Sequence, residues 1–193
     1  FGTYEGTDST HTITLGFRPA FLMIKNVDST SSWCMFDSTR NPTNTITEML
    51  RANTDAVEAT KTDREPTFLD TGFSIGDSDD DTNASGDTFI YMAFAGGKDS
   101  SSTYNTTGDI DSRVKASTTY GQSIVTYTGN DTAGQTVGHG LGTVPEMIIF
   151  KNRDATEVWT VYHANAHASS PEDYYLSLIA TGAPVDNSGI LND

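Results

Sequence analysis

The acidic segment near residue 80 comes closest to metal-binding chemistry. In "DSDDDTN" the carboxylates of Asp77, Asp79 and Asp81 stand at alternate positions, and oxygen atoms at alternate positions can reach one hard cation such as Ca²⁺. The rest of an EF-hand loop is missing, because Thr82 and Thr88 occupy the places of its glycine and glutamate. The segment is a candidate calcium site, and a solvated acidic loop is the alternative that these departures favour.

The histidines offer a second candidate for metal binding. His163 and His167 have the four-residue spacing that would put two zinc ligands on one face of a helix. The glutamate of the H-E-x-x-H pattern is absent, however, and "YHANAHASSPEDYY" is typical of a loop that leaves a strand. His139, within "VGHGLG", is expected to order a glycine-rich turn through side-chain hydrogen bonds. We therefore expect loop-forming histidines rather than a zinc site.

The sequence patterns of the common catalytic sites are absent. The chain has no G-x-S-x-G, no P-loop, no C-x-x-C and no clear pair of carboxylates. Its one cysteine, Cys34, lies in the apolar run "WCMF" and is expected to be a small buried hydrophobic residue. We therefore predict a protein that is not an enzyme and that needs no cofactor.

Composition and charge narrow the class of protein. The 193 residues include 26 acidic and 11 basic side chains, which gives a net charge of −15. The basic residues are scattered, so binding to a phosphate backbone is not expected. No stretch approaches the roughly 18 apolar residues of a membrane span. Hydrophobic residues make up only 35% of the chain, and the abundance of Thr, Ser, Asn, Asp and Gly is typical of a turn-rich β protein.

One segment of the chain occurs twice, as "KNVDSTSSW" at 25–33 and as "KNRDATEVW" at 151–159. Residue 159 minus residue 33 gives an offset of 126, which is too long for solenoid repeats and indicates tandem domains. The residues common to both copies are Pro19, Lys25, Asn26, Asp28 and Trp33 in the first, and Pro145, Lys151, Asn152, Asp154 and Trp159 in the second.

These common residues have a structural and a functional interpretation. Proline fixes the φ angle of a turn, and Asn and Asp side chains stabilise turns by hydrogen bonds to the backbone. Trp33 and Trp159 are expected to begin strands and to fill the core. In the functional alternative, an exposed Trp or Tyr stacks on a sugar while Asp and Asn bind its hydroxyl groups. The structural interpretation is the favoured one.

The elements that carry these residues are predicted to be short β-strands. The predicted strands include "HTITLGF", "AFLMIKN", "WCMFD", "GFSIG" and "TFIYMAFA". The last segment has apolar residues on both faces, which predicts a central strand. Segment 48–59 is compatible with a helix by composition. Its counterpart 174–185 begins with aromatic residues and ends in Gly-Ala-Pro-Val, so we predict a strand and a turn for both.

The predicted organisation is all-β, with tandem antiparallel β-sandwich modules of jelly-roll or lectin-like type. The first module covers residues 1–97, a linker or long loop covers 98–121, and a second, incomplete copy covers 122–193. The second copy lacks counterparts of "GFSIG" and "TFIYMAFA". Because an unfinished sheet leaves a strand edge unpaired, we expect the intact molecule to continue past Asp193 or to assemble with neighbours.

Three longer phrases carry a resemblance to a known family, namely "LGFRPAFLMIKNVDSTSSWCMFDSTR", "TGFSIGDS…NASGDTFIYMAFA" and "VGHGLGTVPEMIIFKNRDATEVWTVYH". They resemble the repeat module of virion and tail-fibre-like proteins of marine bacteriophages, which has a lectin-like (concanavalin-like) β-sandwich character. The resemblance covers most of the chain outside the predicted linker and brings no catalytic motif. It implies a structural or adhesive module at the virion surface, in the extracellular space.

The expected function follows from this resemblance. We expect a non-enzymatic module of a tail fibre or another surface appendage, with other virion proteins or copies of itself as partners. A host surface glycan is a candidate ligand, whereas nucleic acid and membrane insertion are not expected. The alternatives are a capsid decoration protein without a ligand and the carbohydrate-binding module of a depolymerase. A pair of carboxylates across an aromatic-lined cleft would favour an enzyme.

Overall fold

The computed structural model describes residues 1–61, 66–76, 80–96, 102–189 and 191 of the chain. In the described part all regular structure is strand except one short 3-10 helix, η1 (Pro171–Asp173). No helix within these ranges has the length and apolar character needed to cross a membrane. Two compact units form: unit 1 holds residues 1–50 and 59–142, and unit 2 holds residues 51–58 and 143–193. The predicted all-β class with antiparallel sheets is confirmed.

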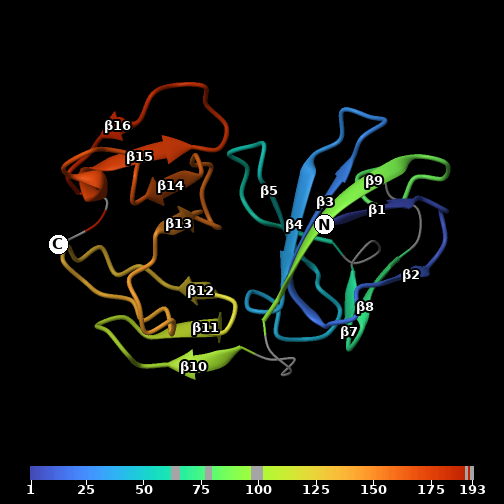
Figure 1. The fold of residues 1–193 in the computed structure, drawn as a ribbon, viewed down its shortest axis with the longest axis horizontal. Coiled ribbons are helices and arrows are strands. Elements are labelled where there is room, and N and C mark those ends of the chain that lie inside the picture. Colours follow the sequence, from blue (N-terminus) through green and yellow to red (C-terminus); the bar gives the residue numbers. More distant parts are fainter. Residues whose placement is uncertain (62–65, 77–79, 97–101, 190, 192–193) are drawn as a thin grey trace. The chain divides into compact units, whose positions relative to one another are not determined.

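The largest sheet has six strands in the order β1-β9-β3-β4-β5-β6. Its strands are β1 (Gly2–Glu5), β9 (Thr88–Ala95), β3 (Pro19–Asn26), β4 (Trp33–Asp37), β5 (Glu48–Arg51) and β6 (Ala59–Thr60). Strand β9 pairs with β1 on one side and with β3 on the other, and Figure 1 shows it between them. This confirms the central strand that the apolar residues on both faces predict.

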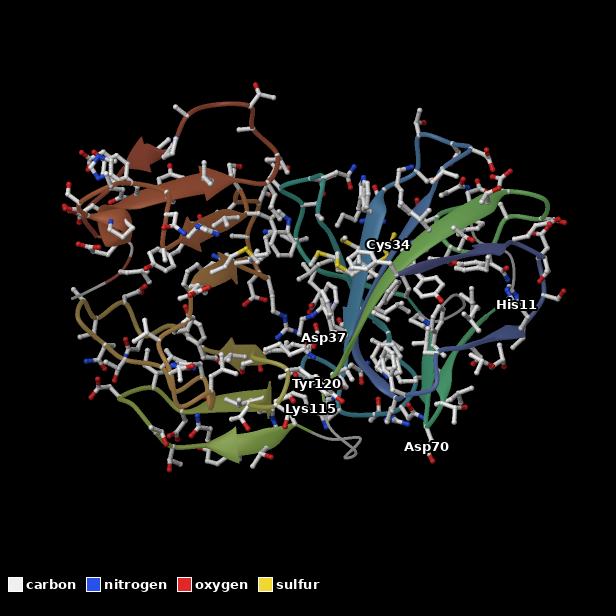
Figure 2. The ribbon with its side chains drawn as sticks, viewed as in Figure 1. His11, Cys34, Asp37, Asp70, Lys115 and Tyr120 are labelled. Carbon is white, nitrogen blue, oxygen red and sulfur yellow. The ribbon has the colours of Figure 1, made fainter. Side chains whose placement is uncertain are left out.

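A second sheet of unit 1 covers one face of the first. It contains β2 (His11–Thr14), β8 (Gly72–Ile75) and β7 (Thr67–Leu69), in that order. The core lies between the two sheets, because fully buried side chains come from both: Leu22, Ile24, Cys34 and Phe36 from the first, and Phe68, Phe73 and Ile75 from the second. Two sheets packed over a shared core make a β-sandwich. The burial of Cys34, labelled in Figure 2, is as predicted.

The predicted linker differs from what the structure contains. Within 98–121 lie β10 (Thr103–Asn105) and β11 (Ser112–Ser117), which form a three-stranded sheet with β12 (Gln122–Tyr127). Ser and Thr suit the exposed face of a pleated sheet, so a hydroxyl-rich segment can form strands without an apolar pattern. In this part of the chain, unit 1 ends at residue 142 and unit 2 resumes at residue 143.

Unit 2 repeats four of the six strands of the large sheet. Its strands are β13 (Met147–Phe150), β14 (Thr160–His163), β15 (Tyr174–Ser177) and β16 (Val185–Asp186), paired in that order. The offset of 126 relates them to β3, β4, β5 and β6 residue by residue. Leu22 faces Phe36 across β3 and β4, and Ile148 faces Tyr162 across β13 and β14. Both copies of segment 48–59 therefore begin with a strand, as their comparison predicts.

The second copy of the sheet is less buried than the first. Within the described residues of unit 2, no strand takes the place that β9 has beside β3. Met147 and Ile149 are 56% and 41% exposed, whereas the equivalent residues Phe21 and Met23 are half-buried. Strand β13 is therefore an edge strand of the sheet described for unit 2.

Candidate functional site

The two repeated turns, residues 25–33 and 151–159, are the first candidate site. In unit 1 the turn connects β3 to β4. The side-chain oxygen of Asn26 accepts a hydrogen bond from the backbone N–H of Asp28, at 2.9 Å. The ammonium group of Lys25 donates to the carbonyl of Ser29 at 2.8 Å and also to the carbonyl of Asn26. Lys25 and Asn26 thus bind the backbone of their own turn, whereas the carboxylate of Asp28 accepts a hydrogen bond from the N–H of Thr88, at 2.6 Å.

The turn in unit 2 makes the same hydrogen bonds. Asn152 accepts from the N–H of Asp154 at 3.0 Å, and Lys151 donates to the carbonyls of Asn152 at 2.6 Å and of Ala155 at 3.0 Å. Burial lowers the pKa of Lys151 from its ordinary value, while the nearby acidic residues act in the opposite direction. Its amine is bound to two backbone carbonyls of its own turn.

The two turns differ in what surrounds the asparagine. Asn26 is fully buried, and its amide also donates to the carbonyl of Asp80 at 3.0 Å and to the carboxylate of Asp87 at 2.8 Å. Asn152 is exposed and donates only a longer bond of 3.2 Å to Glu157 among the bonds described for its amide. The difference follows from β9 and the loop before it, which enclose the first turn.

The tryptophans that end the repeated turns also differ. Trp33 is the first residue of β4 and is 37% exposed, which differs from the prediction that it fills the core. Trp159 is only 4% exposed. Its indole N–H donates to the backbone carbonyls of Arg51, at 2.9 Å, and of Thr54, at 3.1 Å. Trp159 is therefore buried beneath residues 51–58.

Residues 51–58, which we name the covering loop, belong by sequence to the first repeat and by structure to unit 2. The N–H of Glu58 donates to the carbonyl of Arg153 at 2.9 Å, and the N–H of Glu157 donates to the carbonyl of Asp55 at 3.1 Å. The guanidinium of Arg153 pairs with the carboxylate of Glu58, with 2.9 Å between Nε and Oε2. The sequence gives no signal for this contact, because most of it uses backbone atoms.

The candidate calcium ligands are described only in part. Asp77 and Asp79 lie outside the described residues. The carboxylate of Asp81 accepts a hydrogen bond from the N–H of Ser32 at 3.1 Å. Within the described ranges, no group of three or more His, Cys, Asp or Glu side chains is placed to hold a metal ion.

Each of the histidines that the sequence singles out binds the backbone of its own loop. Nδ1 of His163 accepts from the N–H of Asn165 at 3.1 Å, and Nδ1 of His139 accepts from the N–H of Leu141 at 3.3 Å. Nδ1 of His167 accepts from the N–H of Ser170 at 3.3 Å, and the ring stacks on Tyr174 with 4.1 Å between ring centroids. The role of His139 is the turn-ordering one that the sequence predicts.

A shallow depression in unit 1 is a second candidate site, and sequence reasoning misses it. It has a volume of about 820 Å³ and is bounded by β10, β11 and the glycine-rich segment 136–142. Tyr104, 61% exposed, lies at the depression and donates a hydrogen bond to Asp111, which raises the pKa of the tyrosine. Gly138 permits the close approach of the two segments, since a Cβ there would lie 2.5 Å from the amide of Asn105.

The fold and the turns define a class: an all-β protein in which one module occurs twice with the same strand register and the same turn hydrogen bonds. The chain belongs to the family described as "Domain of unknown function (DUF7483)", whose model matches residues 1–98 and again residues 97–193. No curated protein and no solved structure matches the chain. The double match supports the predicted tandem repeat.

Proposed function

We propose that the chain is a non-enzymatic structural module of a bacteriophage particle, in a tail fibre or another surface appendage. The observation that carries the structural role is the use of the common residues within the fold. The lysine and asparagine of both repeated turns bind their own backbone, and one of the two tryptophans is buried. The particle is proposed from the resemblance of the repeated phrases to virion proteins.

Imaging of the intact phage that carries this chain tests the proposal. The chain should be found along a fibre shaft or over the particle surface, in contact with other virion proteins or copies of itself. Absence from the purified particle, checked by mass spectrometry of its proteins, would overturn the assignment. A position at a distal fibre tip would instead favour binding of the host surface.

A second candidate function is binding of a host surface glycan in the depression of unit 1. The observation that favours it is the exposed Tyr104 in a depression that Thr103, Thr107 and Thr136 also line. Sugars stack on aromatic rings and exchange hydrogen bonds with hydroxyl groups. The bond to Asp111 holds the ring in position, so little conformational freedom would be lost on binding.

A glycan array distinguishes the two candidate functions. Fluorescently labelled chain and a Tyr104→Ala variant are applied to bacterial surface glycans, with Tyr127→Ala as the control for loss of an exposed tyrosine. Binding that Tyr104→Ala abolishes and Tyr127→Ala leaves intact supports the glycan site. Binding that both variants retain would place the ligand elsewhere. If the wild type binds no glycan, the structural role is the candidate function that stands.

A further inference from the structure

We propose that β13 of unit 2 binds a strand of the β9 type, supplied by a further copy of the repeat module. The strand would bind along the edge of β13 that faces away from β14, which we name the open edge. In unit 1, β9 lies along the same edge of β3, the counterpart of β13. The inference goes beyond the proposed function and does not depend on a bacteriophage source, because it concerns only how the module is completed.

The backbone of β13 presents hydrogen-bonding groups along the open edge. The N–H of Ala164 donates to the carbonyl of Glu146 at 2.8 Å, so the backbone groups of Glu146 face β14. Because the direction of these groups alternates along an antiparallel strand, those of Ile148 also face β14, whereas those of Met147 and Ile149 point to the open edge. Within the described residues of unit 2 no strand pairs with that edge. Such an edge is a template for a further strand.

Unit 1 shows the register in which such a strand binds. The N–H of Val27 donates to the carbonyl of Thr88 at 3.0 Å, and the pairing of β3 with β9 continues from this point. Hydrogen-bonded pairs then fall at alternate positions, and one of them joins Met23 to Met92. The offset of 126 takes Met23 to Ile149. A bound strand therefore places its counterpart of Met92 opposite Ile149.

The side chains of β13 are also those that a strand of this type covers. Met147 and Ile149 are 56% and 41% exposed, whereas their counterparts Phe21 and Met23 are half-buried beside β9. Burial of this apolar surface favours binding. The strand Met147–Phe150 also contains no proline and no charged residue, which are common means of protecting an edge strand from pairing.

The repeated turn has a carboxylate that binds the start of the strand. In unit 1, Asp28 accepts the N–H of Thr88, the first residue of β9, at 2.6 Å. The second turn keeps this side chain as Asp154, which is exposed. Asp154 is therefore placed to accept the first N–H of an incoming strand.

The asparagine of the turn recognises the residue that precedes the strand. Asn26 donates to the carboxylate of Asp87 at 2.8 Å. Its counterpart Asn152 is exposed and makes a longer bond, of 3.2 Å, to Glu157. An incoming carboxylate can take the place of that glutamate. The chemistry of the partner follows: an extended segment with apolar residues on both faces and an aspartate directly before it.

Binding of a synthetic peptide to the full 193-residue chain tests the inference. The peptide carries residues 86–96, which include β9, followed by a short run of lysines for solubility. Fluorescence polarisation of the labelled peptide should show saturable binding. In the complex, hydrogen exchange measured by NMR should slow at the amides of Met147 and Ile149. The amide of Ile148 faces β14 in both states and should change less.

Two proline variants of the peptide test the register. Met92→Pro removes the N–H that would meet Ile149 and should weaken binding at least about tenfold, because one hydrogen bond is lost and a carbonyl group is left unpaired. Ala93→Pro removes an N–H that points away from β13 and is the matched control. Proline is tolerated where the N–H faces solvent at the edge of a sheet, so this variant should bind nearly as well as the unchanged peptide.

Matching variants of the chain separate the open edge from the fold. Ile149→Pro removes an N–H of the open edge, whereas Ile149→Thr keeps it on a β-branched residue. Only the proline variant should lose binding by about tenfold or more. Asp154→Ala should also weaken binding, and Asp70→Ala, which removes the same charge from another exposed position, should not. Circular dichroism checks that each variant is folded.

Four outcomes would overturn the inference. In the first, the wild type binds no peptide. In the second, Ile149→Pro binds the peptide as tightly as the wild type. In the third, the peptide slows exchange at residues 21–27 and not at 147 and 149, which would mean that it replaces β9 in unit 1. In the fourth, the amides of residues 147 and 149 already exchange slowly without peptide, so that the open edge has another occupant. Sedimentation velocity would then show whether this occupant is a second copy of the chain.

Discussion

Two ion pairs of unit 1 differ in burial, and so in what each contributes to stability. Asp37 and Arg40 are each only 5% exposed, and the carboxylate of Asp37 also accepts the N–H groups of Thr39, at 2.9 Å, and of Arg40, at 2.8 Å. In the second pair, 3.6 Å separates Nη1 of Arg18 from Oδ1 of Asp70, and the side chain of Asp70 is 95% exposed. Figure 2 labels both aspartates. Burial makes a charge costly to leave unpaired, whereas water screens an exposed pair.

Substitution of each aspartate should therefore have different effects. Asp37→Ala leaves the buried guanidinium without its carboxylate and should lower the free energy of unfolding by about 3–5 kcal/mol. Asp70→Ala should lower it by less than about 1 kcal/mol. Urea denaturation followed by circular dichroism measures both. Equal losses would mean that the Asp37 pair is hydrated in solution.

Asp37 corresponds to His163 in the second repeat, and the two side chains share one role. Asp37 accepts the N–H of Thr39, and Nδ1 of His163 accepts the N–H of Asn165, two residues on in each case. Sequence comparison registers the change of residue type and misses the common hydrogen bond. An imidazole nitrogen can take the place of the carboxylate as acceptor in the second repeat, because Ala166 stands there in place of Arg40 and no guanidinium needs a partner.

At the scale of elements, the covering loop depends on the indole N–H beneath it. Trp159→Phe keeps an aromatic ring and removes both hydrogen bonds to the loop carbonyls. Amide hydrogen exchange of residues 51–58 should then become faster, by about tenfold if the net loss is near 1.4 kcal/mol. Trp33→Phe is the matched control and should not change exchange in this loop. Unchanged exchange in Trp159→Phe would mean that packing alone holds the loop.

A carboxylate links two segments beside the depression in unit 1. Asp109 accepts hydrogen bonds from the hydroxyl of Thr136, at 2.7 Å, and from its N–H, at 3.0 Å. These bonds lower the pKa of Asp109, so its contribution to stability is present above the ordinary value of about 3.9 and is lost as pH falls through the lowered pKa. The NMR signal of the Thr136 amide should titrate below pH of about 3.9. Asp109→Asn should abolish this titration, and a midpoint above that value would contradict the prediction.

Strands with strong apolar patterns are predictable from the sequence, and the others are not. Segment 19–26 alternates buried and half-buried residues, and segment 88–95 is an unbroken apolar run from Phe89 to Ala95, so their patterns identify them. Strand β10 has no buried residue and β11 buries serine and lysine beside Val114, so their composition resembles a linker.

Of the candidate sites, the repeated turns can be found in the sequence, because the same residues occur twice. The depression and the covering loop bring together segments that are distant in the sequence, so the spacing of residues along the chain does not predict them.

For the whole molecule, the net charge of −15 opposes association of identical chains. Added salt should therefore strengthen association of the wild type, because charges more than about 10 Å apart are screened at 0.1 M ionic strength. Sedimentation velocity at several NaCl concentrations measures the effect. Weaker association with added salt would mean that unlike charges hold the chains together.

The hydrogen bonds of Trp159 have a consequence for how such chains can evolve. The indole N–H binds carbonyl groups that every amino acid carries. A tandem gene duplication would therefore create a working contact at once, before any mutation adapts the new neighbours to each other. The side chains of the loop can therefore change by mutation without loss of these two hydrogen bonds. Arrays of different length can arise by recombination between copies.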